Sequence, residues 1–144
     1  MNHRSQLGQL GENIACGYLV ENNFKVIERN FRQKWGEIDI IAKAPDKTLV
    51  FVEVKTVRGV EKLHMVSEED VSQISAEDQL TAAKLQKLQR TASLYANHKS
   101  ELVNDRKGWR IDLLAITIKR DYSEFTKELT IKEKDCVIKH YENI

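Results

Sequence analysis

The chain has 144 residues, of which 41% are hydrophobic and 31% are charged, and its formal net charge is +1 at pH 7. This length suits one domain with its own core, and the composition is that of an ordinary globular protein. No apolar run approaches the roughly 20 residues of a membrane span, so no membrane partner is expected. The N-terminus lacks the apolar stretch of a signal peptide, which predicts a cytoplasmic protein. The two cysteines, Cys16 and Cys136, fit no metal-ligand spacing and are expected to be buried thiols.

The first half of the chain predicts one helix and three strands. Apolar residues recur at helical spacing over residues 5–22, and Ser5 can cap the start of this helix. Residues 24–31 alternate well enough to predict a first strand. Two further strands, at residues 36–41 and 49–55, are separated by a turn-forming break at residues 44–47.

The second half begins with an acidic, serine-interrupted stretch at about residues 58–78, which we expect to be a long mobile loop. A second helix is predicted at about residues 77–98, and a strand buried on both faces at residues 109–118. Residues 128–134 predict a weaker edge strand. The chain is therefore expected to be a single α/β domain over residues 1–144, ordered helix, three strands, helix and one or two strands. Its core would span about residues 5–118, and residues 119–144 would form the edge strand and tail.

The second and third strands have two chemically different faces. Alternate side chains of a strand point to opposite sides, so one face is expected to be wholly apolar: Ile38, Ile40, Ala42, Val50, Val52 and Val54. The other face carries four charged residues, Glu37, Asp39, Glu53 and Lys55. An antiparallel register that pairs Asp39 with Glu53 leaves a loop of plausible length and sets two carboxylates side by side. Like charges facing each other are destabilising unless a cation lies between them.

This arrangement suggests metal-assisted hydrolysis of a phosphodiester. Two carboxylates suit Mg²⁺ or Mn²⁺, with water and substrate phosphate as the remaining ligands, and a nearby lysine can stabilise charge on phosphorus. The alternative is an ordinary solvent-facing strand, because cross-strand charge pairs give modest stability and short motifs match often. The strands alone leave both interpretations open.

Other charged residues raise similar questions. Lys84 falls on the apolar line of the second helix, so its charge needs either a path to water or an anionic partner. Lys87 and Arg90 flank it, and they form either a basic edge that meets phosphates or an ordinary solvated helix face. Glu12 on the first helix either reaches the carboxylates or lies in water. Asp112, within the buried strand, is expected to pair with Arg110 or a neighbouring helix. All four histidines are expected to be exposed: His3, His64, His98 and His140.

Five separated blocks resemble the YraN-like family, in the family's order and over roughly residues 5–118. They are Gly11-Glu12 with Ala15, Gly36-Glu37-Ile38-Asp39, Val50-Phe51-Val52-Glu53-Val54-Lys55-Thr56, Thr81 with Lys84, Leu88, Arg90 and Ala92, and Arg110-Ile111-Asp112. The family is assigned to the PD-(D/E)XK nuclease superfamily, close to archaeal Holliday junction resolvases. The resemblance implies a restriction-endonuclease-like fold, in which helices flank a mixed central sheet and the metal site lies on the central hairpin.

By position, the resemblance makes Asp39 and Glu53 metal-binding carboxylates, Lys55 the catalytic lysine, and Glu12 a helical glutamate that completes the acidic site. Lys84 matches the basic residue of the helix after the motif, and we add Lys87 and Arg58 as expected nucleic-acid contacts. The chain departs from the family by placing Val57 between Thr56 and Arg58. It departs also in its long acidic segment after the motif, whose charge would repel phosphates.

Two functions follow from these observations. The first is a Mg²⁺- or Mn²⁺-dependent endonuclease that acts on DNA, including branched or junction DNA, and that forms a homodimer as resolvase-like relatives do. The second is a catalytically silent module that binds nucleic acid or a protein on the same fold. Retention of both carboxylates and the lysine favours the first.

Overall fold

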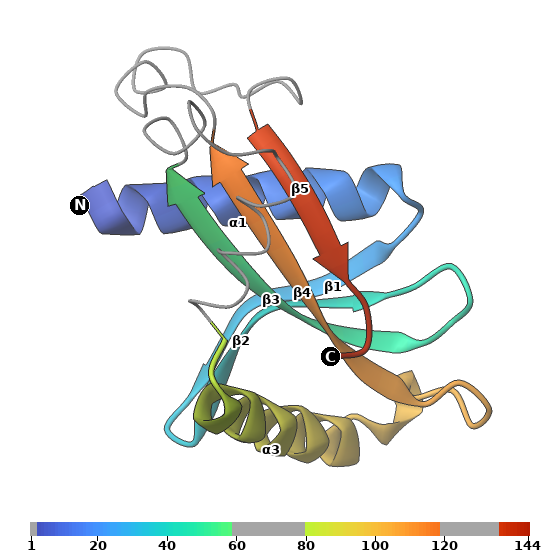
Figure 1. Cartoon of the computed structure of the whole chain (residues 1–144). Coiled ribbons are helices and arrows are strands. Elements are labelled where there is room, and N and C mark those ends of the chain that lie inside the picture. The colour runs from blue at the N-terminus through green and yellow to red at the C-terminus, as the bar shows by residue number, and fades with distance from the viewer. Residues whose placement is uncertain (1–2, 59–79, 119–135) are drawn as a thin grey trace.

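A computed structural model of the chain describes residues 3–58, 80–118 and 136–144 (Figure 1). The elements in chain order are α1 (His3–Glu21), β1 (Lys25–Gln33), β2 (Gly36–Lys43), β3 (Leu49–Arg58), α3 (Ala82–His98), the 3-10 helix η1 (Ser100–Leu102), β4 (Trp109–Ile118) and β5 (Cys136–Tyr141). The predicted single α/β domain and its element order are confirmed. The acidic loop expected at residues 58–78 lies, apart from its first residue, outside the described part of the chain.

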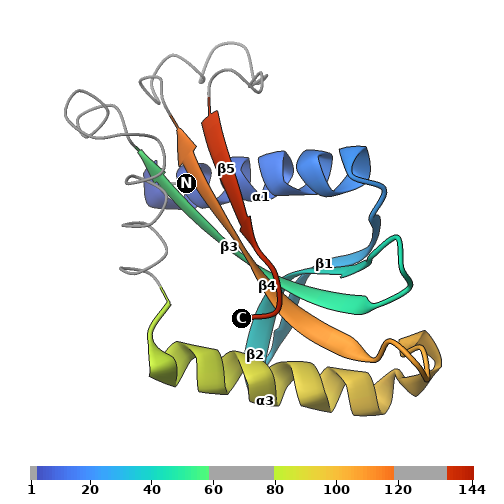
Figure 2. The same cartoon turned by 45° about the vertical axis from the view of Figure 1, so that its right-hand side comes forward.

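The strands form one mixed sheet in the order β1-β2-β3-β4-β5. Short turns join β1, β2 and β3 as antiparallel neighbours, while β3 and β4 are parallel and α3 lies on the connection between them. Two views show the sheet running between α1 and α3 (Figures 1 and 2). Within the described residues, one helix therefore covers each side of the sheet.

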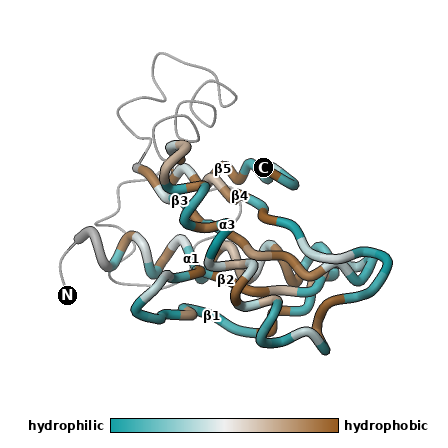
Figure 3. The backbone as a smooth tube through the Cα atoms, turned by 90° about the horizontal axis from the view of Figure 1, so that it is seen from below, coloured by the Kyte–Doolittle hydropathy of each residue, from teal (hydrophilic) through white to brown (hydrophobic). Residues whose placement is uncertain are grey.

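Two hydrophobic clusters reflect this layering. Ala15 and Leu19 of α1 pack against one face of the sheet. The side chains on that face come from alternate strand positions: Ile40, Ala42, Val50, Val52, Leu114 and Ile116. Leu88, Ala92 and Tyr95 of α3 pack with the opposite set, Ile38, Ile41, Leu49, Phe51 and Ile111. Every β4 residue from Ile111 to Ile118 is buried, as predicted. Hydrophilic residues predominate along the edge strand β1 (Figure 3).

The position of Lys84 differs from the prediction. The second helix begins at Ala82, where Thr81 caps it by accepting a hydrogen bond from the Lys84 backbone N–H at 3.2 Å. The first buried residue of α3 is Leu88, so Lys84 lies in an exposed turn before the helix reaches the sheet. Its side chain is exposed rather than part of the buried line.

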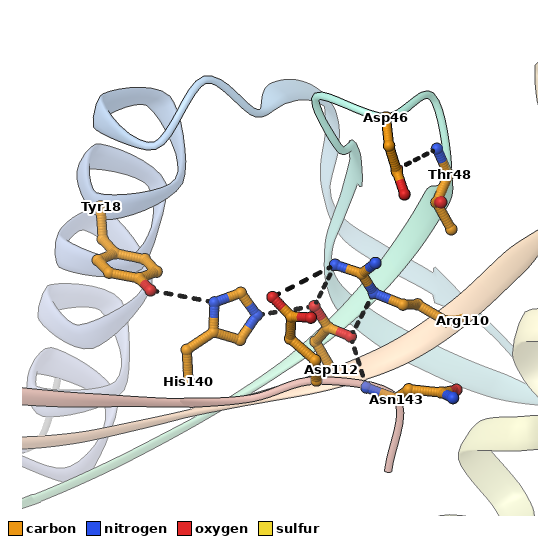
Figure 4. A network of polar contacts seen from close by, with 8 residues as sticks. Tyr18, Asp46, Thr48, Arg110, Asp112, His140 and Asn143 are labelled. Carbon is orange, nitrogen blue, oxygen red and sulfur yellow. Dashed lines mark hydrogen bonds and ion pairs between the residues drawn. The ribbon is translucent and has the colours of Figure 1, made fainter. Parts of the chain in front are cut away.

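The prediction for the C-terminal histidine was wrong. The strand expected at residues 128–134 lies outside the described residues, and the edge strand beside β4 is β5 at Cys136–Tyr141. His140 of this strand is not exposed: its Nε2 lies 2.7 Å from Asp112 Oδ2, and its Nδ1 lies 3.0 Å from the Tyr18 hydroxyl (Figure 4). The ring is held between a helix and a buried carboxylate that lie far from it in sequence.

Asp112 is the centre of this network (Figure 4). Its side chain is fully buried and accepts hydrogen bonds from Arg110 Nε at 2.9 Å, from His140 and from the Asn143 backbone N–H at 3.0 Å. Burial alone would raise the pKa of Asp112, but the hydrogen bonds from His140, Arg110 and Asn143 outweigh it and lower that pKa. The predicted pairing with Arg110 is confirmed, and the network ties the C-terminal residues to the core.

Two further sequence predictions concern the cysteines and membrane spans. Cys136 is buried and Cys16 is partly buried. Among the helices of the described ranges, none is long and apolar enough to cross a membrane.

Candidate active site

The candidate site begins where β2 separates from β3. Their ladder runs from the Lys43–Leu49 pair to the Ile40–Val52 pair and stops there, although continuing it would set Asp39 opposite Glu53 as predicted. Asp39 instead turns its carboxylate onto β3, where Oδ2 accepts a hydrogen bond of 2.8 Å from the Val54 backbone N–H. The carboxylate thereby replaces the hydrogen-bond acceptor that the β2–β3 ladder no longer provides for the Val54 N–H. The bond also places Asp39 beside the strand that carries Glu53 and Lys55.

An unusual backbone conformation accompanies this separation. The β1–β2 register passes from Arg29–Ile40 to Phe31–Ile38, so Asn30 lies opposite Asp39. Asn30 has φ +54, in the left-handed region that asparagine tolerates better than most residues. A residue in this conformation interrupts the regular alternation of the strand.

The interruption changes which face the neighbouring side chains occupy. Ile40 packs in the cluster under α1, whereas Ile38, two residues earlier, packs in the cluster under α3. The expected wholly apolar face is therefore correct for Ile40 but wrong for Ile38. Strict alternation predicts one face for both, and it fails where Asn30 and Asp39 break the pleat.

Asp39 and Glu53 carry unfavourable negative charge. Burial raises the pKa of Glu53 first, the neighbouring Asp39 charge raises it further, and together they bring it to about 7 despite Lys55. Burial also raises the pKa of Asp39, although the Val54 N–H and Lys55 oppose the shift. Two carboxylates that are costly to ionise together are the electrostatic setting in which a bound cation is stabilising.

Lys55 is the cation nearest to Glu53. Its Nζ lies 3.4 Å from Glu53 Oε1, and the two side chains are 23% and 20% exposed. Both charges therefore lie at a partly water-accessible surface, where a substrate can reach them. One monovalent lysine lowers the pKa of Glu53 but does not return it to its ordinary value of 4.5.

Glu12 approaches the site from α1. Its side chain is 15% exposed and its pKa is raised, first by burial and then by the charge of Asp39. Arg29 Nη2 lies 3.9 Å from Glu12 Oε2 and also donates to Asn13 Oδ1 at 2.7 Å, so this arginine holds the acidic part of α1 against β1. The helical glutamate thus shares the electrostatic field of Asp39.

Sequence reasoning missed two arginines of β1. Arg29 and Arg32 both oppose the raised pKa of Glu12, and Arg32 does the same for Asp39. Arg32 also forms an exposed ion pair with Glu37 at 2.9 Å. Their spacing of three residues is not that of one strand face, so only the interrupted pleat at Asn30 brings both charges near the carboxylates.

The expected nucleic-acid contacts are less closely grouped. Lys84 and Lys87 are exposed on α3, and Arg58 is the last residue of β3, with its side chain outside the described part. Both lysines lie on α3, whereas Asp39 lies on β2 and Glu53 on β3.

Two glycines allow the helices to approach the strands that carry the site. A Cβ at Gly11 would lie 1.7 Å from Thr56 Oγ1, which is buried and has no hydrogen-bond partner among the described residues. A Cβ at Gly36 would lie 2.0 Å from Thr91 Oγ1 of α3. Each glycine immediately precedes an acidic residue of the predicted blocks, and the first sets the distance between Glu12 and β3.

The donor set suits a hard divalent ion held by few protein ligands. Within residues 3–58, 80–118 and 136–144, no three His, Cys, Asp or Glu side chains converge closely enough to form a metal cluster alone. Mg²⁺ is commonly bound by one or two carboxylates together with waters and substrate phosphates. Asp39 and Glu53 fit this mode, and Glu12 fits it as a nearby negative charge.

The Gly11 contact gives a first prediction. Gly11→Ala should lower the free energy of unfolding by about 1–3 kcal/mol, because the new methyl group collides with Thr56 in a packed interface. Gly8→Ala is the matched control, since nothing lies within 4 Å of a Cβ there, and it should stabilise α1 by up to about 1 kcal/mol. Urea denaturation followed by circular dichroism measures both. Equal effects of the two substitutions would contradict the close contact.

The raised pKa of Glu53 gives a second prediction. Below its ordinary pKa of 4.5, Glu53 is neutral in both the folded and the unfolded state, so its burial costs no stability. As pH rises through about 7, the buried carboxyl must ionise, and stability is lost. Without divalent ions, Glu53→Gln should therefore be more stable than wild type at about pH 8, by up to about 3 kcal/mol at about 1.4 kcal/mol per pKa unit. The difference should vanish near pH 4.5.

Thermal unfolding across this pH range checks the second prediction. Glu37→Gln serves as the control because Glu37 is 66% exposed, and its effect should not depend on pH in the same way. A Glu53→Gln variant that gains nothing at about pH 8 would show that Glu53 ionises there without cost.

Comparisons with known proteins identify the family of this chain. The sequence profile described as "Uncharacterised protein family UPF0102" matches residues 11–116, a range that includes Glu12, Asp39, Glu53 and Lys55. A UPF0102 protein of Syntrophotalea carbinolica is 37% identical over 121 residues, which cover 84% of this chain and 86% of the relative. One of Corynebacterium efficiens is 32% identical over 117 residues, or 80% of each chain.

A shorter match is closer in sequence. A UPF0102 protein of Campylobacter lari is 58% identical over 52 residues, and the alignment covers 36% of this chain but only 46% of that relative. The family profile and the two long alignments span most of the described core. The chain therefore belongs to the UPF0102 family, the YraN-like family that its sequence blocks resemble.

Proposed function

We propose that this chain is a Mg²⁺- or Mn²⁺-dependent endonuclease that hydrolyses phosphodiester bonds in DNA. The observation that carries the proposal is the pair of partly buried carboxylates, Asp39 and Glu53, where burial and then the charge of Asp39 raise the pKa of Glu53 to about 7. Lys55 lies 3.4 Å from Glu53 beside them. Structural surface charges seldom combine buried like charges with one adjacent lysine, whereas metal-dependent phosphodiester hydrolysis needs this combination.

Each residue has a distinct part in the proposed reaction. Asp39 and Glu53 would hold the ion, and the Val54 N–H fixes the orientation of Asp39. When bound, the ion would polarise the phosphate and lower the pKa of a coordinated water. Lys55 orients the attacking water and stabilises negative charge at phosphorus. Glu12 adds negative charge from α1, restrained by Arg29.

The substrate class follows from the resemblance and from the surrounding charges. Similarity to PD-(D/E)XK nucleases and archaeal Holliday junction resolvases supports branched DNA, and a homodimer would suit a two-fold-symmetric junction. Arg58, Lys84 and Lys87 would contact the phosphate backbone away from the cleaved bond. Such contacts give salt-dependent affinity without sequence selection.

Cleavage of labelled junction, duplex and single-stranded DNA tests the proposal. Purified wild-type protein should cleave at least one substrate with Mg²⁺ or Mn²⁺ and none with EDTA. Asp39→Asn should slow cleavage by about 100-fold or more because it weakens a ligand of the ion, and Lys55→Ala should do so because it removes positive charge beside the reacting phosphate. Lys107→Ala, at an exposed lysine in the turn before β4, should leave the rate unchanged.

Two outcomes would oppose this function. Cleavage that persists unchanged in both Asp39→Asn and Lys55→Ala would place the activity elsewhere. Salt-sensitive DNA binding without cleavage of any substrate, together with no Mn²⁺ binding, would favour the catalytically silent module instead.

A further inference from the structure

A cavity lies between β1, the β1–β2 turn and the C-terminal half of α3. Its volume is about 370 Å³, within the range of small-molecule sites, and it has an aromatic wall and a polar rim. The proposed metal-site residues do not line it. It therefore needs a separate explanation.

Three rings form the aromatic wall. Phe31 packs edge-on against Tyr95, with ring centroids 5.0 Å apart, and lies tilted against Trp35 at 5.7 Å. Tyr95 is buried, and its hydroxyl donates to Glu28 Oε1 at 3.0 Å, so the innermost ring is fixed. Trp35 is partly exposed at the outer end of the wall. The indole of Trp35, supported by Phe31, is thus available to stack with a planar aromatic ligand.

The polar groups complement an aromatic guest that carries a negative charge. Gln33 and Glu28 line the cavity and can pair with the edge of a heterocycle. His98 and Lys99, both exposed at the end of α3, line it from the other side. An aromatic cage for a cation would not place a lysine on its rim, because that lysine would repel the guest. A base with its attached phosphate satisfies all of these groups.

We propose that this cavity receives an unpaired nucleobase of a DNA strand, which stacks on Trp35 while Lys99 contacts its phosphate. The choice of DNA rests on the proposed nuclease function, but the pocket acts in binding and not in the hydrolysis itself. Asp39 follows Trp35 by four residues, so their Cα atoms are at most about 14 Å apart. A strand whose base occupies the cavity would pass close to the carboxylates.

The site would give the enzyme a preference for DNA with unpaired bases. Stacking of a base on an aromatic side chain is tolerant of sequence, and a base held in a duplex cannot reach the pocket without first leaving the stack. Single-stranded flaps and gaps at branched sites offer such bases at no added cost. The cavity would therefore select a DNA structure rather than a sequence.

Binding of a fluorescein-labelled oligothymidylate in EDTA tests this proposal without any cleavage. Trp35→Ala should weaken binding by about tenfold or more, and Trp35→Phe, which keeps a stacking surface, should lose much less. Lys99→Ala should weaken binding and reduce its salt dependence. Val20→Ala is the matched control, because Val20 is a 59% exposed apolar side chain on α1, and it should bind like wild type.

The test separates this pocket from the nuclease proposal. Affinity for a blunt duplex should be nearly the same in wild type and Trp35→Ala. Oligothymidylate affinity unchanged by both Trp35→Ala and Lys99→Ala would overturn the inference, as would competition by tetramethylammonium but not by thymidine monophosphate. Failure of all DNA cleavage would oppose the nuclease alone, since the binding experiment contains no metal.

Discussion

The hydrogen bond between Asp39 and the Val54 N–H is the interaction on which the site depends. Where β2 leaves β3, this N–H loses its ladder partner, and an unpaired buried donor would cost about 1–3 kcal/mol. Asp39 Oδ2 accepts it at 2.8 Å and is thereby fixed between the two strands. The same bond that completes the backbone pairing holds the carboxylate against β3, close enough for its charge to raise the pKa of Glu53.

The helices complete the arrangement through close contacts rather than through long side chains. Gly11 lets α1 lie directly against Thr56 of β3, and Gly36 lets β2 lie against Thr91 of α3. A side chain at either position would separate a helix from its strand. These contacts explain why glycine precedes Glu12 and Glu37, and they connect the packing of the fold with the charge that gathers at its surface.

Alternation in the two central strands was sufficient to predict β2, β3 and the neighbouring positions of Asp39 and Glu53, because residue patterns report which face a side chain occupies. It could not predict the reversal of Ile38, which lies beside the position where Asn30 of β1 has a left-handed backbone. Nor could it find the Asp112–His140 contact, since those residues are 28 positions apart and belong to separate strands. Lys84 was misplaced because helical spacing does not tell where the helix first meets the sheet.

The central claim is that Asp39 and Glu53 bind a divalent ion, and Mn²⁺ titration followed by electron paramagnetic resonance tests it most directly. At about pH 8, wild type should remove Mn²⁺ from solution. Asp39→Asn should bind Mn²⁺ more than about tenfold more weakly, because loss of a residue that only supports a metal ligand already costs roughly tenfold in affinity. Lys55→Ala should still bind the ion. Absence of binding by wild type, or equal binding by Asp39→Asn, would contradict the account.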